Sequence, residues 1–79
     1  ILIYFSADWC PQCKTFEPFL EELSESIDII KVNVDKYKNL AIKYGIMSIP
    51  TTILFEKKKV VKEMIGPQSK EELEIIKEG

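Results

Sequence analysis

Length, composition and charge narrow the classes of protein to which this chain can belong. It has 79 residues, enough for one domain and near the lower limit for a hydrophobic core that folds without extra cross-links. Its formal net charge is −2 and it contains no arginine, which disfavours nucleic-acid binding. It also contains no histidine, which excludes histidine-based catalysis and histidine-ligated metals.

The first third of the chain predicts a strand, a helix and a second strand. Residues 1–6 are apolar and mostly β-branched or aromatic, which is typical of a buried strand, and residues 29–34 form the second strand. Pro11 is suited to the first turn of the helix between them, where the N–H that proline lacks is not needed. Pro18 lies inside this helix and should kink it.

The helix that begins at Pro11 has an apolar side and an acidic side. The apolar side chains recur at helical spacing, and the glutamates fall largely on the opposite face. The apolar residues are Cys13, Phe16, Leu20, Leu23 and Ile27, and the acidic residues are Glu17, Glu21, Glu22 and Glu25.

A short helix and an extended loop follow the second strand. Asp35 is a suitable N-cap for this helix, which would carry Leu40 and Tyr44 on one face. Gly45 suits its C-terminal end. Residues 46–50 then lead as an extended loop to a proline.

The C-terminal part predicts a hairpin and a last helix. Residues 52–55 and 60–65 are strands joined by a lysine-rich turn, which we interpret as a solvated turn. Ser69 followed by Glu72 forms a capping box for the last helix. The first βαβ unit should be parallel with a right-handed crossover. The chain is therefore expected to be an α/β protein with a four-stranded mixed sheet flanked by helices.

Two cysteines, three positions apart, carry the clearest chemical signal. The Cys10-Pro11-Gln12-Cys13 segment follows a hydrophobic strand and opens a helix, a context in which C-x-x-C indicates a redox dithiol. The free N–H groups and partial positive charge of a helix N-terminus favour a thiolate at Cys10. Cys13, one turn further along, should be less exposed and placed to attack a mixed disulfide formed at Cys10.

Two other interpretations of the cysteine pair stay open at this point. Half of a zinc site would need further ligands from carboxylates or from a second copy, since the chain has no other cysteine and no histidine. A short structural disulfide or two buried thiols is the third interpretation, because cysteine is often simply buried.

Several motifs in the same order resemble the thioredoxin family. Residues 4–14 are similar to the thioredoxin active-site strand and loop, including the tryptophan before the first cysteine, and Pro18 falls where thioredoxins have a helix-kinking proline. The other similar segments are residues 31–35, 43–46, 48–51 and 65–66. The resemblance implies a thioredoxin fold, βαβαββα, formed by a single domain over residues 1–79 that lacks the N-terminal strand and helix of full thioredoxins.

The resemblance also implies roles for individual residues. Cys10 would be the attacking nucleophile and Cys13 the resolving thiol, with a cis Pro50 beside them. The backbone of Ile49 would pair with an extended substrate segment. Lys31 would be a buried or half-buried lysine near the resolving cysteine, with a role in proton transfer. The apolar rim that receives partner proteins would consist of Trp9, Pro11, Ile49, Pro50, Ile65 and Pro67.

Simpler structural explanations exist for some of these residues. Trp9 could serve core packing, Pro50 could be an ordinary trans proline, and the Lys31 side chain could extend from a strand to solvent. Asp8 could be a solvated loop carboxylate.

The chain departs from the family pattern at two places. Pro11-Gln12 stands between the cysteines where thioredoxins have Gly-Pro, and a proline first is closer to glutaredoxins. Tyr4 stands where thioredoxins have a buried aspartate thought to move the proton of the resolving cysteine. Tyrosine cannot be that base near neutral pH because its reference pKa is about 10. Water, Lys31 or another group must then take the proton from Cys13, or the step is slower.

These patterns together predict a thiol–disulfide oxidoreductase that reduces disulfides of partner proteins through a Cys10–Cys13 redox-active centre, in electron transport and cell redox homeostasis. We expect no metal or organic cofactor, an upstream electron donor that is a reductase or glutathione, a monomer, no nucleic-acid or membrane partner, and a cytoplasmic location. A glutathione-linked glutaredoxin-like enzyme and a disulfide oxidase or isomerase are alternatives. A thioredoxin-fold docking module without turnover is the non-enzymatic alternative.

Overall fold

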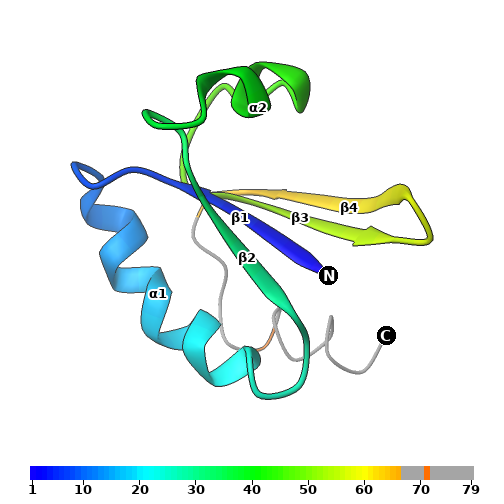
Figure 1. The fold of residues 1–79 in the computed structure, drawn as a ribbon. Coiled ribbons are helices and arrows are strands. Elements are labelled where there is room, and N and C mark those ends of the chain that lie inside the picture. Colours follow the sequence, from blue (N-terminus) through cyan, green and yellow to red (C-terminus); the bar gives the residue numbers. More distant parts are fainter. Residues whose placement is uncertain (67–70, 72–79) are drawn as a thin grey trace.

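The strands β1 (Leu2–Ser6), β2 (Ile29–Asn33), β3 (Thr51–Glu56) and β4 (Lys59–Ile65) form a mixed sheet with the order β2-β1-β3-β4 (Figure 1). A computed structural model describes residues 1–66 and residue 71. β1 pairs with β2 in parallel and with β3 antiparallel, and β3 pairs with β4 antiparallel. In the sequence, helix α1 (Pro11–Leu23) lies between β1 and β2, and helix α2 (Lys38–Lys43) lies between β2 and β3.

Alternation along β1 divides the core between the two faces of the sheet. Leu2 and Tyr4 are fully buried against α1, in a cluster that includes Cys13 and Phe16 of that helix. Phe5 points to the other face, where the chain around α2 covers it. Figure 1 shows α1 and α2 on opposite sides of the sheet. The cluster on the α1 side contains more buried residues than the cluster on the α2 side. Because each large apolar side chain that becomes fully buried contributes about 1.5–3 kcal/mol, the α1 side contributes the larger share of the stability.

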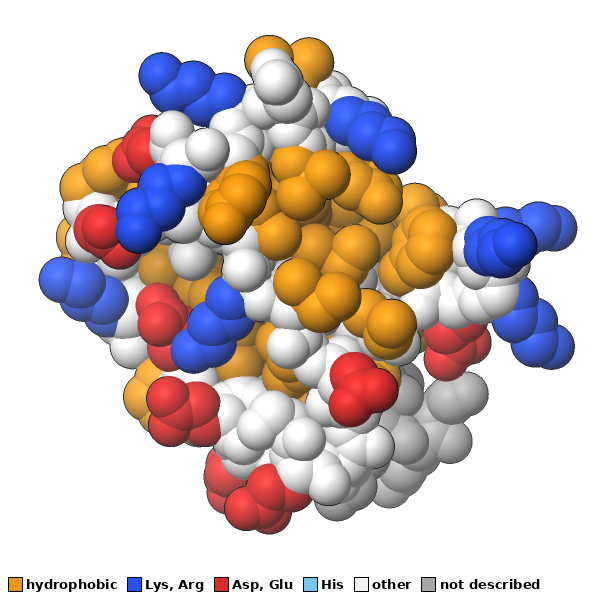
Figure 2. Space-filling view, viewed as in Figure 1, with side chains coloured by type: hydrophobic (Ala, Val, Ile, Leu, Met, Phe, Trp, Pro, Cys, Tyr) orange, Lys and Arg blue, Asp and Glu red, His pale blue; other side chains and the backbone are white. Residues whose placement is uncertain are grey.

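Apolar side chains also remain accessible over part of the sheet. Figure 2 shows them gathered over the strands, with lysine and acidic side chains around them. Their exposure is consistent with the short α2, which covers little of the sheet. No helix among residues 1–66 is long and apolar enough to cross a membrane.

The element order, the parallel β1–β2 pair and the hairpin are confirmed as far as Gly66. Pro18 lies inside α1, and Gly45 follows α2 at a left-handed φ of +65° that favours glycine. The hairpin turn places Lys57 and Lys58 at positive φ, the backbone that two-residue hairpin loops require. The predicted last helix and Pro67 lie outside the described residues.

The prediction that Asp35 caps α2 was wrong. The N-cap residue is Tyr37, and it makes no side-chain capping hydrogen bond. The Asn33 side chain instead accepts hydrogen bonds from the backbone N–H groups of Asp35 and Lys36, at 2.9 and 3.2 Å. An asparagine turn of this kind starts the segment before the helix, which leaves the Asp35 carboxylate available for another partner.

Candidate active site

The two cysteines lie at the N-terminal end of α1 and form a disulfide. Cys10 is the N-cap residue, with extended backbone, and its Sγ accepts a hydrogen bond of 3.1 Å from the Cys13 N–H. The two Cα atoms are 5.3 Å apart, within the range that a disulfide spans. The same N–H would stabilise a thiolate at Cys10 once the pair is reduced, together with the partial positive charge of the helix end.

Both cysteines are buried, and they differ little in exposure. Cys10 is 3% exposed and Cys13 is 0% exposed. The order agrees with the expectation that Cys13 is the less accessible residue. The small accessible area of the pair thus belongs to Cys10.

The loop before β3 brings a proline to the same end of the molecule. The Ile49–Pro50 peptide bond is cis, and Pro50 is almost completely buried. Its carbonyl accepts a hydrogen bond of 2.8 Å from the Gly66 N–H, which ties the start of β3 to the end of β4. Ile49 packs against the cluster that contains both cysteines. The structure thus places the loop at 49–50 and the disulfide together.

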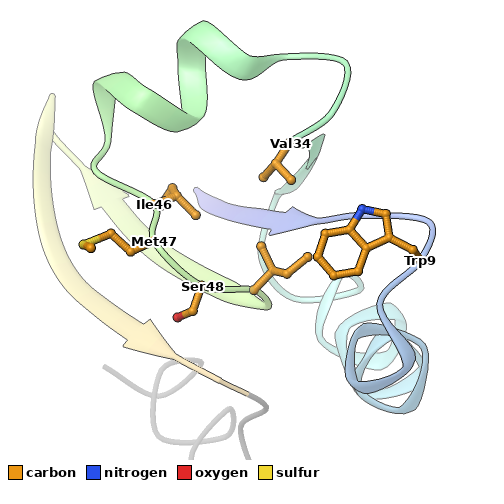
Figure 3. A pocket seen from close by; sticks show the side chains of 6 residues that line it. Trp9, Val34, Ile46, Met47 and Ser48 are labelled. Carbon is orange, nitrogen blue, oxygen red and sulfur yellow. The ribbon is translucent and has the colours of Figure 1, made fainter.

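Trp9 stands beside the disulfide and borders an apolar groove (Figure 3). Its side chain is 66% exposed, and its indole Nε1–H donates a hydrogen bond of 2.8 Å to Asp35 Oδ2. In Figure 3 the indole lies at one end of the groove and Met47 at the other. The groove has a volume of about 310 Å³ and is lined by Trp9, Val34, Ile46, Met47, Ser48 and Ile49.

The remaining predicted site residues lie at the surface. Pro11 is exposed, and Ile65 is 65% exposed at the end of β4. The Lys31 side chain is half exposed, and its Nζ lies 4.0 Å from Glu17 Oε1. Asp8 is exposed and accepts a hydrogen bond of 3.3 Å from the Asn33 side chain.

A polar cluster beneath the disulfide was not anticipated. The hydroxyl of the fully buried Tyr4 lies 3.2 Å from the Cys13 carbonyl oxygen and 3.4 Å from Glu17 Oε2, both of which accept its hydrogen bond. Burial, and then the negative charge of Glu17, raise the pKa of Tyr4 above its ordinary value. Helical periodicity assigned Glu17 to the outer face of α1, whereas the side chain reaches back to the sheet. The signal that could have found it is its spacing of four residues from Cys13.

Metal-ligating side chains do not gather elsewhere in the part of the chain that the structure describes. Within residues 1–66 and 71, no group of three or more cysteine, aspartate or glutamate side chains could hold a metal ion.

Known proteins resemble this chain in both sequence and structure. The family model for thioredoxin matches residues 1–78. Thioredoxin of Alicyclobacillus acidocaldarius is 44% identical over 78 residues, which cover 94% of this chain and 74% of the relative. Thioredoxin of Staphylococcus aureus is 43% identical over 76 residues, which cover 91% of this chain and 73% of the relative.

Two solved structures share the fold. A mutant thioredoxin from Halobacterium salinarum superposes with a TM-score of 0.90 at 38% identity, covering 98% of this chain and 70% of that chain. Reduced Schistosoma mansoni thioredoxin superposes with a TM-score of 0.87 at 37% identity, covering 98% of this chain and 74% of that chain. The chain therefore belongs to the thioredoxin family, and with a disulfide between Cys10 and Cys13 it is a thiol–disulfide oxidoreductase.

Proposed function

We propose that this protein works in the reducing direction, donating two electrons to disulfides of partner proteins. The position of Cys10 at the helix N-cap, where the Cys13 N–H already points at its sulfur, supports Cys10 as the attacking residue. The reducing direction is taken from the thioredoxin family, whose model matches residues 1–78. A helix N-terminus stabilises the thiolate of the reduced form, and the thiolate is the attacking species.

The reaction balances as two thiol–disulfide exchanges. The Cys10 thiolate attacks one sulfur of the partner disulfide, and the other sulfur leaves as a thiolate that takes up a proton. Cys13, after losing its proton, attacks Cys10 Sγ and releases the second partner thiolate. The partner gains two electrons and two protons, and the protein is left with the Cys10–Cys13 disulfide. An upstream donor, a reductase or glutathione, then reduces this disulfide.

The groove beside the disulfide supports a role in receiving the partner. Trp9 and Ile49 line it at the side of the cysteines, and an extended peptide with an apolar residue next to its cystine would fit there. We assign the Ile49 backbone to pairing with that peptide as an added strand. Pro11 and Ile65, which are exposed, would complete the rim together with Pro67, and the buried Pro50 would shape it from below.

We place the protein in the cytoplasm, as a monomer that contributes to electron transport and redox homeostasis. This proposal rests on the redox chemistry and on the lack of further cysteines that a secreted domain of this size normally carries.

Reduction of insulin by dithiothreitol tests the proposed function. Catalytic amounts of the protein should accelerate it, and the Cys10→Ser variant should not. Replacing dithiothreitol with glutathione distinguishes the donors, because a glutaredoxin-like enzyme would turn over with glutathione alone. Failure of the wild-type protein to accelerate reduction with either donor would contradict the proposal.

A further inference from the structure

The second exchange requires a proton acceptor for Cys13. A thiolate is the nucleophile, and a thiol with a reference pKa of about 8.5 is mostly protonated at neutral pH. Cys13 is 0% exposed, so bulk water has little access to it in this conformation. The chain contains no histidine that could take the proton.

Tyr4 contacts Cys13 but cannot be the acceptor. Its hydroxyl is buried, and burial together with the charge of Glu17 raises its pKa, so that it remains a neutral hydrogen-bond donor. Tyr4 instead links the Cys13 backbone to the Glu17 carboxylate through its hydroxyl. The same hydroxyl reaches the Cys13 carbonyl at 3.2 Å and Glu17 Oε2 at 3.4 Å, which places a carboxylate next to the turn of α1 that carries Cys13.

Three separate elements position the Glu17 carboxylate. On α1 it follows Cys13 by four residues, and side chains at that spacing lie on the same face of a helix. Tyr4 of β1 and Lys31 of β2 are directly paired in the parallel register, so both point to the α1 side of the sheet. Tyr4 contacts one carboxylate oxygen, and Lys31 Nζ lies 4.0 Å from the other.

The carboxylate also has a path to solvent. Glu17 is about one-third exposed, at 34%, and lines an open polar cleft of about 500 Å³. The other charged or titratable groups that face this cleft are Asp8, Lys14, Lys31, Lys36 and Tyr37. A proton accepted at Glu17 can therefore leave to water, while a proton on Cys13 is enclosed by the core.

We propose that Glu17 is the proton acceptor for Cys13 in the resolving step, with Tyr4 and Lys31 as the residues that position it. As Cys13 Sγ attacks Cys10 Sγ, the thiol proton passes through one bridging water to a carboxylate oxygen of Glu17. The Cys10–partner bond breaks, and the partner sulfur leaves with its electron pair. The proton on Glu17 then exchanges with solvent. The inference rests on the proposed order of attack, with Cys10 first and Cys13 second.

An aromatic disulfide reagent that releases one coloured thiolate at each exchange separates the two steps. Reduced protein mixed rapidly with the reagent should give a first release from attack by Cys10 and a second from resolution by Cys13. Glu17→Gln keeps the size of the side chain but removes the base. We expect it to slow the second release at pH 7 by about tenfold or more and to leave the first unchanged.

The pH profile provides the readout that a merely structural role would not move. With Glu17 present, the second rate should rise less steeply between pH 6 and 8 than the thiolate fraction of Cys13 does. In Glu17→Gln it should rise by about tenfold per pH unit, following the thiolate fraction of Cys13. Glu21→Gln, one turn further along α1 and exposed, is the matched control and should behave like the wild type. Tyr4→Phe should slow only the second release, by less than Glu17→Gln.

The possible results separate this inference from the proposed function. An unchanged second rate and pH profile in Glu17→Gln would overturn the role of Glu17, as would an equal loss of both releases. Absence of the first release in the wild-type protein would instead contradict the proposed order of attack.

Discussion

The Trp9 indole Nε1–H donates a hydrogen bond of 2.8 Å to Asp35 Oδ2 across 26 positions of the chain. The bond joins the loop before α1 to the segment between β2 and α2. It holds an indole that is 66% exposed at the edge of the apolar groove. Because the side chain has little packing to restrain it, this hydrogen bond fixes the shape of the rim beside Cys10.

Removing the acceptor should weaken partner binding more than chemistry. Asp35→Ala loses a hydrogen bond worth about 0.5–1.5 kcal/mol, which corresponds to a rise of about two- to tenfold in KM for a protein disulfide. The rate with a small aromatic disulfide should stay the same. Asp35→Asn, which keeps an acceptor oxygen, is the control and should retain most of the wild-type KM. Equal losses with both substrates in Asp35→Ala would show that Asp35 acts on the cysteines instead.

Substitution of each cysteine should give a different product. Cys13→Ser keeps the attacking thiol but lacks the resolving one, so it should accumulate a covalent mixed disulfide with a partner. Cys10→Ser should form none, because Cys13 is fully buried. Mass spectrometry without reductant measures the adducts. Accumulation in Cys10→Ser in place of Cys13→Ser would reverse the assignment of the two roles.

The core between α1 and the sheet should depend on Phe16. Its ring is 1% exposed and meets the Tyr4 ring edge-on, with centroids 5.8 Å apart. Phe16→Ala should lower the free energy of unfolding by about 3–5 kcal/mol, because it removes a buried ring and leaves a cavity. Phe19→Ala, on the same helix with 37% of the side chain exposed, should cost clearly less. Urea unfolding followed by circular dichroism compares them, and equal losses would contradict this packing.

Stability at alkaline pH should reflect the raised pKa of Tyr4. Above about pH 10 the unfolded tyrosine loses its proton while the folded one keeps it, so the stability of the native state falls as pH rises. The slope from this group is at most about 1.4 kcal/mol per pH unit. Tyr4→Phe lacks it.

Urea unfolding at pH 8 to 11 measures this difference. Tyr4→Phe should be the less stable protein at pH 8, because it loses a hydrogen bond to the Cys13 carbonyl. The difference in the free energy of unfolding between the wild type and Tyr4→Phe should become smaller above pH 10. A gap of constant size would show that the Tyr4 hydroxyl titrates normally in the folded state.

Local patterns predicted much of the fold because each reports a local physical constraint. The apolar run at residues 1–6, Pro18 inside a helix and Gly45 at a helix end all depend on short-range geometry, and the structure agrees with each. The C-x-x-C segment depends likewise on the strand and helix that flank it.

Contacts between side chains far apart in the sequence could not be predicted from such local patterns. Asp35 was assigned to a helix cap because its type and position suit one. In the structure the Asn33 side chain accepts the hydrogen bond that forms the turn, and the Asp35 carboxylate accepts a hydrogen bond from the Trp9 indole. Glu17 was assigned to the solvent face because the periodicity of apolar residues describes the helix as a whole and not the direction of one side chain. Its contacts with Tyr4 and Lys31 depend on the register of β1 with β2, which no local pattern specifies.

The equilibrium of the Cys10–Cys13 couple with dithiothreitol and glutathione buffers tests the central claim most directly. We predict a single two-electron transition with a reduction potential of about −270 mV, as in thioredoxin, or lower. A reversible couple near −120 mV would contradict the reducing direction and indicate disulfide formation. Absence of any reversible dithiol–disulfide transition would contradict the redox function itself.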